Sequence, residues 1–283
     1  MAQSQQQTSA EVSNKEIAEY YDISQFWYTH FWSPTGLHYG FWYEDTKTLE
    51  EAVMNTNKFV MKLLGINTQD VVLDAGCGVG GTSMYIAEEK GVKVEGITLS
   101  EVQLKIAKER AAQSKVGNLI GFSQQDFTKT NFREGTFSKV FGIESICHAH
   151  RKIDFLKEAY RVMKPGGKIA VIDAFLTETA LDPEENKIYT KFIEGWAVPN
   201  LSTKEGFIED LVQAGFRNVV FHDMHDKVKK SSERIYRHSL FTYPINFISS
   251  KLGFSRENFS ARYQKALFDR KIATYGVFVA EKS

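Results

Sequence analysis

Two side chains that can carry acid–base chemistry, Glu144 and His148, stand four residues apart in the segment GIESICHAH. The apolar run over 137–143 before them is typical of a buried strand, and ligands of open α/β sheets bind where such strands end. Histidine supplies a base near neutral pH, and a carboxylate stabilises developing positive charge. If the segment is helical, both side chains project from one face. Each also has a structural interpretation: His148 as a hydrogen-bonded core histidine, Glu144 as a carboxylate that holds nearby backbone amides.

A glycine-rich loop, AGCGVGG, follows the apolar run VVL and precedes a predicted helix. Glycines let the backbone turn tightly and let a ligand approach closely. Gly76, Gly78 and Gly81 match the dinucleotide pattern G-x-G-x-x-G, which is a weak signal alone. Asp74, however, places a carboxylate at the mouth of the site, where it would repel a diphosphate and attract an ammonium group. The next strand also ends in ITLS, without the acidic residue that usually holds the ribose of NAD. The alternative is a tight turn that binds nothing.

Strands and helices alternate from about residue 70 to 175, which predicts βαβ units and a parallel sheet. Ser100 is a predicted helix N-cap with Gln103 at the capping-box position. Gly65 is a plausible stop for the helix that begins near Thr48. The expected strands cover 71–73, 92–97, 120–124, 137–143, 168–174, 219–222 and 275–280. The expected helices cover 17–21, 26–32, 48–64, 82–90, a segment from 100 onward, 154–163 and 204–214.

Composition narrows the class of protein. The 283 residues contain 35 Lys+Arg and 35 Asp+Glu, so the formal charge is zero, which argues against nucleic acid as a partner. No apolar run approaches the roughly 18 residues of a membrane span, and the start lacks a secretory signal, so a cytoplasmic chain is expected. Cys77 and Cys147 are too few for a disulfide framework. No His, Asp and Glu set has ligand spacing, so no metal site is expected.

Around the glycine loop the sequence resembles the class I S-adenosylmethionine-dependent methyltransferases, whose first motif is hydrophobic-hydrophobic-Asp-x-Gly-x-Gly-x-Gly. The further segments TLS with Gln103, QDF at 125–127, ESICH at 144–148 and KPGG at 164–167 carry the same resemblance, which covers about 16–280. It implies S-adenosyl-L-methionine as cofactor and a Rossmann-like α/β fold, a mostly parallel seven-stranded sheet with helices on both faces. The cofactor-binding residues that it implies are Tyr21, Asp74, Gly76, Cys77, Gly78, Gly80, Thr98, Leu99, Gln103, Asp126 and Phe127. For Thr98 and Gln103 the alternative is simple helix capping.

Within that superfamily the chain is similar to the small-molecule subgroup of sterol, tocopherol, sugar and prenyl-diphosphate methyltransferases. There a histidine matching His148 acts as general base or lines the acceptor pocket, and a glutamate matching Glu144 steadies developing positive charge. The resemblance therefore implies C- or O-methylation of a small, partly hydrophobic metabolite, with Glu144 and His148 catalytic. The expected organisation is a disordered tail over 1–16, an N-terminal helical lid over 17–66 and a methyltransferase domain over 67–283, with an acceptor-binding insertion at about 178–270.

Eleven of the 37 aromatic residues fall between Tyr20 and Tyr43. This segment, with TLEEA after it, is similar to the part that covers the cofactor in the subgroup and in cyclopropane fatty acid synthases. In those synthases a cysteine matches Tyr39 and a tyrosine matches Phe41, which argues against their bicarbonate site here. Plain packing of the aromatic residues is the alternative. Two other functions stay open: methylene transfer to a lipid alkene, and a non-catalytic S-adenosylmethionine-binding regulatory protein.

Two further segments allow more than one interpretation. The aromatic residues between Trp196 and Phe268 suggest an apolar acceptor pocket, or else ordinary core packing. The basic residues from Lys227 to Arg237 are expected to form a solvated face, with a site for a phosphate, a carboxylate or an anionic membrane surface as the alternative. A protein or RNA methyltransferase is disfavoured, because GIESICH stands where an Asn-Pro-Pro-Tyr type of motif would follow the fourth strand.

Overall fold

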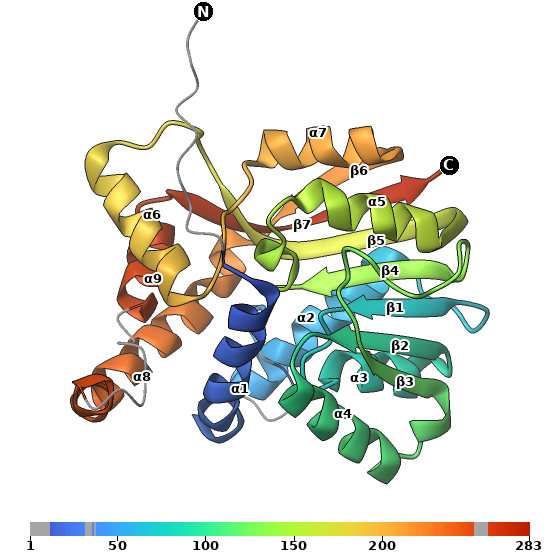
Figure 1. Ribbon diagram of the computed structural model, residues 1–283, viewed down its shortest axis with the longest axis horizontal. Helices are drawn as coiled ribbons and strands as arrows, with labels where there is room; N and C mark the ends of the chain where they lie inside the picture. Colours follow the sequence, from blue (N-terminus) through green and yellow to red (C-terminus); the bar gives the residue numbers. More distant parts are fainter. Residues whose placement is uncertain (1–11, 32–35, 37, 252–259) are drawn as a thin grey trace, which may run out of the picture.

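A seven-stranded sheet in the order β3-β2-β1-β4-β5-β7-β6 forms the centre of the molecule (Figure 1). The computed structural model describes residues 12–31, 36, 38–251 and 260–283, with 24–31 and 241–251 described by their backbone alone. The pairs from β3 to β5 are parallel, whereas β7 runs antiparallel to β5 and β6. The expected mostly parallel α/β fold is confirmed. The strands are β1 (Val71–Ala75), β2 (Lys93–Thr98), β3 (Ile120–Gln124), β4 (Phe137–Ile143), β5 (Met163–Leu176), β6 (Phe216–Asp223) and β7 (Ala273–Lys282).

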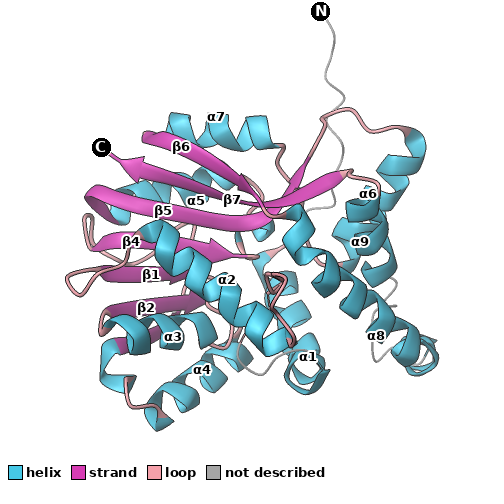
Figure 2. Ribbon diagram, turned by 180° about the vertical axis from the view of Figure 1, so that it is seen from behind, coloured by secondary structure: helices cyan, strands magenta, loops and turns pink. Residues whose placement is uncertain are grey.

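Helices cover both faces of this sheet. Figure 2 shows α2 and α3 in front of the strands, with α5 and α7 behind them. Because successive side chains of a strand point to opposite faces, Val72 belongs to the core that includes Val60 of α2, while its neighbour Leu73 belongs to the core that includes Leu156 of α5. Alternating burial thus gives one sheet two cores. The helices of these layers are α2 (Leu49–Leu64), α3 (Gly81–Lys90), α4 (Glu101–Gln113), α5 (Lys152–Val162) and α7 (Lys204–Ala214).

Local sequence signals set several helix ends as expected. Thr48 caps α2 in a reciprocal capping box with Glu51, and Gly65 ends the helix at φ 61°. The Ser100 side chain accepts a hydrogen bond from the Gln103 backbone and so begins α4. These signals act within a few residues, and the sequence alone therefore locates them.

The N-terminal helix α1 (Asn14–Phe31) differs from the expectation. The two short pieces over 17–21 and 26–32 are wrong, because one continuous helix spans 14–31. Ser13 and Glu16 form the reciprocal hydrogen bonds of a capping box, so three residues of the predicted tail, 14–16, are already helical. The rest of that tail up to residue 11 lies outside the described residues. The second half of the expected lid, α2, packs on the sheet.

The expected insertion over 178–270 is not one unit. α7 and β6 lie within it, yet β6 pairs with β7 and α7 packs on α5, so both belong to the sheet layers. The additions are instead α6 (Pro183–Gly195), α8 (His225–Lys251) and α9 (Ser260–Asp269). Together with α1 they gather beyond the end of the sheet where the parallel strands finish (Figures 1 and 2). Within the described residues, no helix combines the length and apolar character needed to cross a membrane.

Candidate active site

A cavity of about 280 Å³ lies where the parallel strands end, between the sheet and the helices α1, α6, α8 and α9. Residues far apart in the sequence meet there, including both predicted catalytic residues. Two predicted residues, Gly80 and Asp126, do not line it. The predicted residues that do are Tyr21, Asp74, Gly76, Cys77, Gly78, Thr98, Leu99, Gln103, Phe127, Glu144 and His148.

Asp74 is the second-last residue of β1 and lines the cavity. Its side chain is 3% exposed, so the carboxylate is buried and does not stand at an open mouth as expected. Ser83 Oγ of α3 donates a hydrogen bond of 2.6 Å to Asp74 Oδ2. Burial raises the pKa of Asp74 to about 7, and the Ser83 bond opposes part of that rise. A buried carboxyl group without a cationic partner of its own is suited to a ligand that brings positive charge.

The glycine loop after β1 bends back over β2. The backbone N–H groups of Gly76 and Cys77 both donate to Ile97 O at 2.9 Å, which leaves the loop tied to the neighbouring strand. Gly76 has φ 90°, and a Cβ there would lie 2.3 Å from Ser145 Cβ. Gly80 has φ 79° and faces the Phe122 ring instead. Gly80 is the N-cap of α3 and does not line the cavity, so its role in cofactor binding stays a prediction.

Thr98 and Gln103 sit side by side on the cavity wall. Thr98 Oγ1 donates to Gln103 Oε1 at 3.1 Å and accepts the Ser100 backbone N–H at 3.2 Å. Both residues are buried and both line the cavity. The pair thus orders the start of α4 and also presents polar atoms to a ligand, so the capping interpretation and the binding interpretation are compatible.

Phe127 lines the cavity, whereas its neighbour Asp126 does not. The Asp126 carboxylate accepts the backbone N–H and the hydroxyl of Thr128, and it also accepts Asn14 Nδ2 of α1 at 2.7 Å. Phe127 lines the cavity and stacks edge-to-face on Phe155 at 5.4 Å between ring centroids. Asp126 therefore anchors α1 outside the cavity, while Phe127 supplies an apolar surface within it.

Glu144 follows β4 in a left-handed backbone conformation, with φ 51°. Its Oε1 accepts two hydrogen bonds, from the Tyr39 backbone N–H at 2.7 Å and from Tyr275 OH at 2.6 Å. Burial raises the pKa of Glu144 to about 8 despite these donors. The alternative role of holding a backbone amide is thus present, and it coexists with a place on the cavity wall.

His148 lies on a different part of the same turn. The residues after Glu144 form only a short 3₁₀ turn, Ile146–His148, so the condition of a helical segment is not met, yet both side chains line the same cavity. His148 Nδ1 lies 3.0 Å from Ala197 O, and a carbonyl oxygen only accepts, so the ring proton is on Nδ1. His148 Nε2 then accepts from Tyr21 OH of α1 at 2.8 Å. Burial lowers the pKa of His148 to about 4, which keeps the ring neutral near pH 7.

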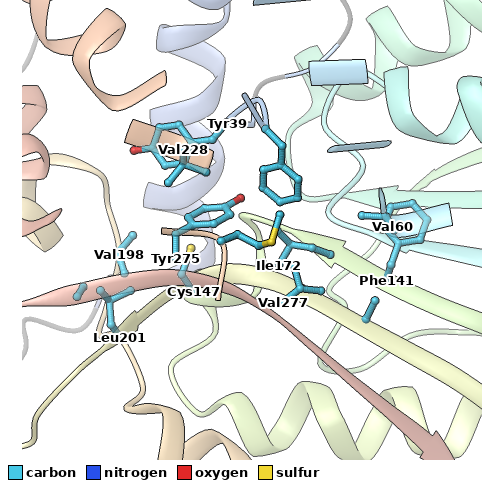
Figure 3. Close-up of a cluster of buried hydrophobic side chains, with 14 of the residues drawn as sticks. Tyr39, Val60, Phe141, Cys147, Ile172, Val198, Leu201, Val228, Tyr275 and Val277 are labelled. Carbon is cyan, nitrogen blue, oxygen red and sulfur yellow. The ribbon is translucent and has the colours of Figure 1, made fainter. Parts of the chain in front are cut away.

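Several residues that line the cavity were not predicted from the sequence. Asp173 of β5 is 4% exposed and accepts the Cys147 N–H at 2.8 Å; a charged residue inside the apolar run IAVIDAF was its signal. Tyr275 of β7 packs edge-to-face against Tyr39, as Figure 3 shows, and nothing local marks it out from other strand aromatics. Trp196 and Phe268, which bound the segment suggested as an acceptor pocket, also line the cavity, whereas His38, Ile235 and His238 line it without having been singled out.

The basic residues at the start of α8 lie against aromatic rings. Lys227 Nζ sits 5.0 Å from the centroid of Tyr43, and Lys230 Nζ sits 5.4 Å from that of Trp42. Lys229 pairs with Asp226 at 2.6 Å. These contacts fit the solvated face that the sequence predicted.

Comparison with known proteins gives a consistent set of similarities. The family model described as mycolic acid cyclopropane synthetase matches residues 7–237. The sterol 24-C-methyltransferase ERG6 of Saccharomyces cerevisiae is 30% identical over 215 residues, 75% of this chain and 56% of the yeast protein. The chloroplastic tocopherol O-methyltransferase of Arabidopsis thaliana is 29% identical over 238 residues, 78% of this chain and 68% of the plant protein.

A solved structure shares the fold. The cyclopropane synthase MmaA2 from Mycobacterium tuberculosis superposes with a TM-score of 0.83 at 18% identity, over 98% of this chain and 100% of that one. In contrast, the chain spans 56–61% of the length of the three fungal sterol methyltransferases that it matches. The likeness to MmaA2 therefore concerns the whole fold, and the likeness to the sterol enzymes concerns a part of them.

Proposed function

Because the chain belongs to the mycolic acid cyclopropane synthetase family, we propose that it is an S-adenosyl-L-methionine-dependent methyltransferase that acts on a small, partly hydrophobic metabolite. One observation carries the proposal. The glycine loop with buried Asp74, and the pair Glu144 and His148, open into the same cavity. The residues that would bind the cofactor and those that would act on the acceptor thus face one cavity, and a direct group transfer requires that closeness.

The residues present fit the proposed cofactor. S-adenosyl-L-methionine, when bound, supplies a methyl group on a positively charged sulfur. Asp74 offers a buried carboxylate to an ammonium group, and the Gly76 backbone leaves room where a Cβ would collide with Ser145. Thr98 and Gln103 offer polar atoms for hydroxyl groups, and Phe127 offers an apolar face to a base. Tyr21 and the loop residues Cys77, Gly78 and Leu99 complete the proposed binding set.

The charge of the cavity wall argues for an acceptor without an anionic group inside the chamber. Asp74, Glu144 and Asp173 all line the cavity; Asp74 and Asp173 are buried and Glu144 is partly buried. Among the described residues of the wall, none is a lysine or an arginine. A buried phosphate or carboxylate would therefore lack a counter-charge, which is costly in an apolar setting. The apolar wall on the acceptor side is formed by Phe192, Trp196, Val198, Ile235 and Phe268.

The residues that line the cavity could support two reactions, methylation of a hydroxyl group or of an alkene. A hydroxyl acceptor can give its proton to His148 Nε2 as the oxygen gains the methyl group, because that nitrogen carries no proton and the ring is neutral. Tyr21 OH occupies Nε2 in the structure, so the acceptor replaces it or passes the proton through it. An alkene acceptor that takes the methyl group instead becomes a carbocation, which the Glu144 carboxylate and the Tyr39 and Tyr275 rings would stabilise until the neighbouring carbon gives its proton to that carboxylate.

Two other functions remain as alternatives. Methylene transfer to a lipid alkene, as the family name implies for some members, would use the same Glu144 and would yield a ring product. A regulatory protein that binds the cofactor without catalysis would use only the Asp74 side of the cavity. Neither alternative yields a methylated small product.

The first experiment separates these outcomes. Calorimetry with S-adenosyl-L-methionine tests binding, and mass spectrometry of a metabolite extract incubated with the labelled methyl donor tests transfer. We expect binding and, with a donor whose methyl group carries three deuterons, a product in which a methyl group has replaced a hydrogen and all three deuterons are kept; a cyclopropane product would keep two. Asp74→Asn should weaken binding by roughly 1–3 kcal/mol, because it removes the charge facing an ammonium group. A folded sample that binds no cofactor would sink the proposal; binding without any product would favour the regulatory alternative, and a cyclopropane product the synthase alternative.

A further inference from the structure

Lys152 is a buried lysine for which the proposed reaction has no direct use. It is the first residue of α5 and is 5% exposed. Its Nζ donates to Cys147 O at 2.8 Å, Ala149 O at 2.6 Å, Asn200 O at 2.8 Å and Asn200 Oδ1 at 3.0 Å. An ammonium group so deeply buried is costly unless oxygen atoms replace its water. Four acceptors around one nitrogen fix this side chain in place.

The four acceptors belong to two segments that meet at His148. Cys147 and Ala149 flank His148 in the chain, so their carbonyl groups set the course of its backbone. Asn200 lies three residues after Ala197, whose carbonyl oxygen accepts the His148 Nδ1 proton. Asn200 Nδ2 also donates to His150 O at 3.0 Å. Lys152 therefore joins the segment that carries the imidazole to the segment that carries its hydrogen-bond acceptor.

Only the short 3₁₀ turn Ile146–His148 provides regular secondary structure at this point, and the segment from Ala197 to Asn200 has none. Ala197 has φ 52°, a left-handed conformation that a residue with a Cβ keeps only where its surroundings hold it. On the other side, Asp173 Oδ2 accepts the Cys147 N–H, while Lys152 binds the carbonyl group of the same residue. Two buried charges of opposite sign thus hold the Cys147 backbone from both sides.

We propose that Lys152 is a positioning residue for His148, which it fixes as the Nδ1–H tautomer with an unprotonated Nε2 directed at Tyr21. The proposal rests on the proposed role of His148 as a base, because only that role needs Nε2 without a proton. An ammonium group suits the task since its three donors radiate from one point, whereas the planar fork of an arginine would not match these carbonyl groups.

The charge of Lys152 acts in the same direction as its hydrogen bonds. The titratable groups around His148 are Tyr21 from α1, Glu144 and Cys147 from the same turn, Asp173 from β5 and Lys152 from α5. After burial, which is the main cause, the positive charge of Lys152 also lowers the pKa of His148. Removal of Lys152 should therefore loosen the ring and make it easier to protonate.

Nitrogen NMR of the protein labelled in its histidine rings tests this without any turnover. In the unaltered protein we expect His148 with a proton on Nδ1 alone down to about pH 4. In Lys152→Met we expect a mixture of the two neutral tautomers and a titration midpoint raised by about one pH unit or more. A folded Lys152→Met protein whose His148 signals match the unaltered protein would overturn the proposal.

Two companion variants make the result decisive. Lys168→Met is the matched control, because Lys168 forms a half-exposed ion pair with Glu281 at the other end of β5; its His148 signals should not change. If Lys152→Met does not fold, Asn200→Ala decides, since it removes one acceptor of Lys152 and the bond to His150. A smaller change in the same direction supports the proposal, and unchanged signals refute it.

Failure of the proposed function would give a different result from failure of the proposal for Lys152. The NMR result needs neither cofactor nor acceptor, so it stands even if the protein transfers no methyl group. If it does transfer one to a hydroxyl group, Lys152→Met should lower kcat and shift the acid limb of its pH profile upward. The KM for the cofactor should stay close to its original value, since Lys152 lies outside the cavity wall.

Discussion

Glu144 and His148 illustrate how burial, the main cause of both pKa shifts, favours the uncharged form of two ionisable residues with opposite roles. Burial disfavours the charged form of each, so the pKa of Glu144 rises to about 8 and that of His148 falls to about 4. Near pH 7 the carboxyl group therefore tends to hold a proton and the imidazole lacks one. Each residue becomes charged only when an opposite charge or a proton arrives from the reactants, which is the condition that a transferred methyl cation creates.

Two substitutions would show whether an oxygen or a carbon atom of the acceptor is methylated. If oxygen is methylated, His148→Ala should lower kcat by about 10²–10⁴-fold, the usual contribution of a general base, and Glu144→Gln should cost much less. If carbon is methylated, the order should reverse, because Glu144 then stabilises the cation. Single-turnover kinetics with the identified acceptor measure both. Unchanged rates in both variants would show that neither residue takes part.

Gly76 should be sensitive to the smallest substitution for two separable reasons. Gly76→Ala combines a φ of 90° with a Cβ placed 2.3 Å from Ser145 Cβ, so it should destabilise the protein by roughly 2–5 kcal/mol. Gly135→Ala is the control, since its φ is 65° but nothing lies within 4 Å of the new Cβ. Thermal unfolding compares them. Equal losses would mean that the contact with Ser145 contributes nothing.

At the scale of elements, α1 is the cover of the cavity, and side-chain bonds hold it there. Tyr21 OH donates to His148 Nε2, Asn14 donates to Asp126, and Ser100 Oγ donates a short hydrogen bond to Asp22. All three partners come from strand ends or the turns after them. The position of α1 therefore depends on the same edge of the sheet that forms the site.

Tyr21→Phe should loosen this cover. The change keeps the ring and removes the hydrogen bond to His148, so α1 should open more often and proteases should cut it faster by about fivefold, as expected for the loss of a bond worth about 1 kcal/mol. Limited proteolysis with mass mapping measures the rate. Lys15→Ala, on the exposed side of the same helix, is the control. Equal rates in both variants would show that Tyr21 does not hold the helix.

For the whole molecule, the buried carboxyl groups should couple cofactor binding to pH. At pH 7 Glu144, with a pKa of about 8, is largely protonated, and Asp74, with a pKa of about 7, is about half protonated. A cationic sulfur entering the cavity favours their ionised forms, so binding should release protons. S-adenosylhomocysteine has no sulfonium charge and should release fewer.

Calorimetry in two buffers of different ionisation enthalpy counts those protons. Affinity for S-adenosyl-L-methionine should rise between pH 6 and 8 relative to its demethylated product. Glu144→Gln should remove part of that rise, because one of the titrating groups is gone. The same proton count for both ligands would contradict the coupling.

The full length of α1, Asn14–Phe31, could not be predicted from the sequence. Two short helical pieces were expected over 17–21 and 26–32, yet one helix runs through both, and Asp22 and Tyr21 each bond to residues more than seventy positions away. Tertiary contacts override weak local preferences of this kind. Tertiary contacts also explain why the expected insertion is not one unit, since only the pairing of β6 with β7 shows that β6 belongs to the sheet.

The sequence by itself determined the alternation of strands and helices, the cap at Ser100 and the glycine loop with Asp74, because each depends on groups a few residues apart. Only the tertiary structure decided that Phe127 and not Asp126 meets the cavity, and that Tyr275 bonds to Glu144. It also decided the tautomer of His148, through the carbonyl group of Ala197. Such contacts join positions 49 to 131 residues apart. No local pattern specifies them, since the sheet order brings those positions together.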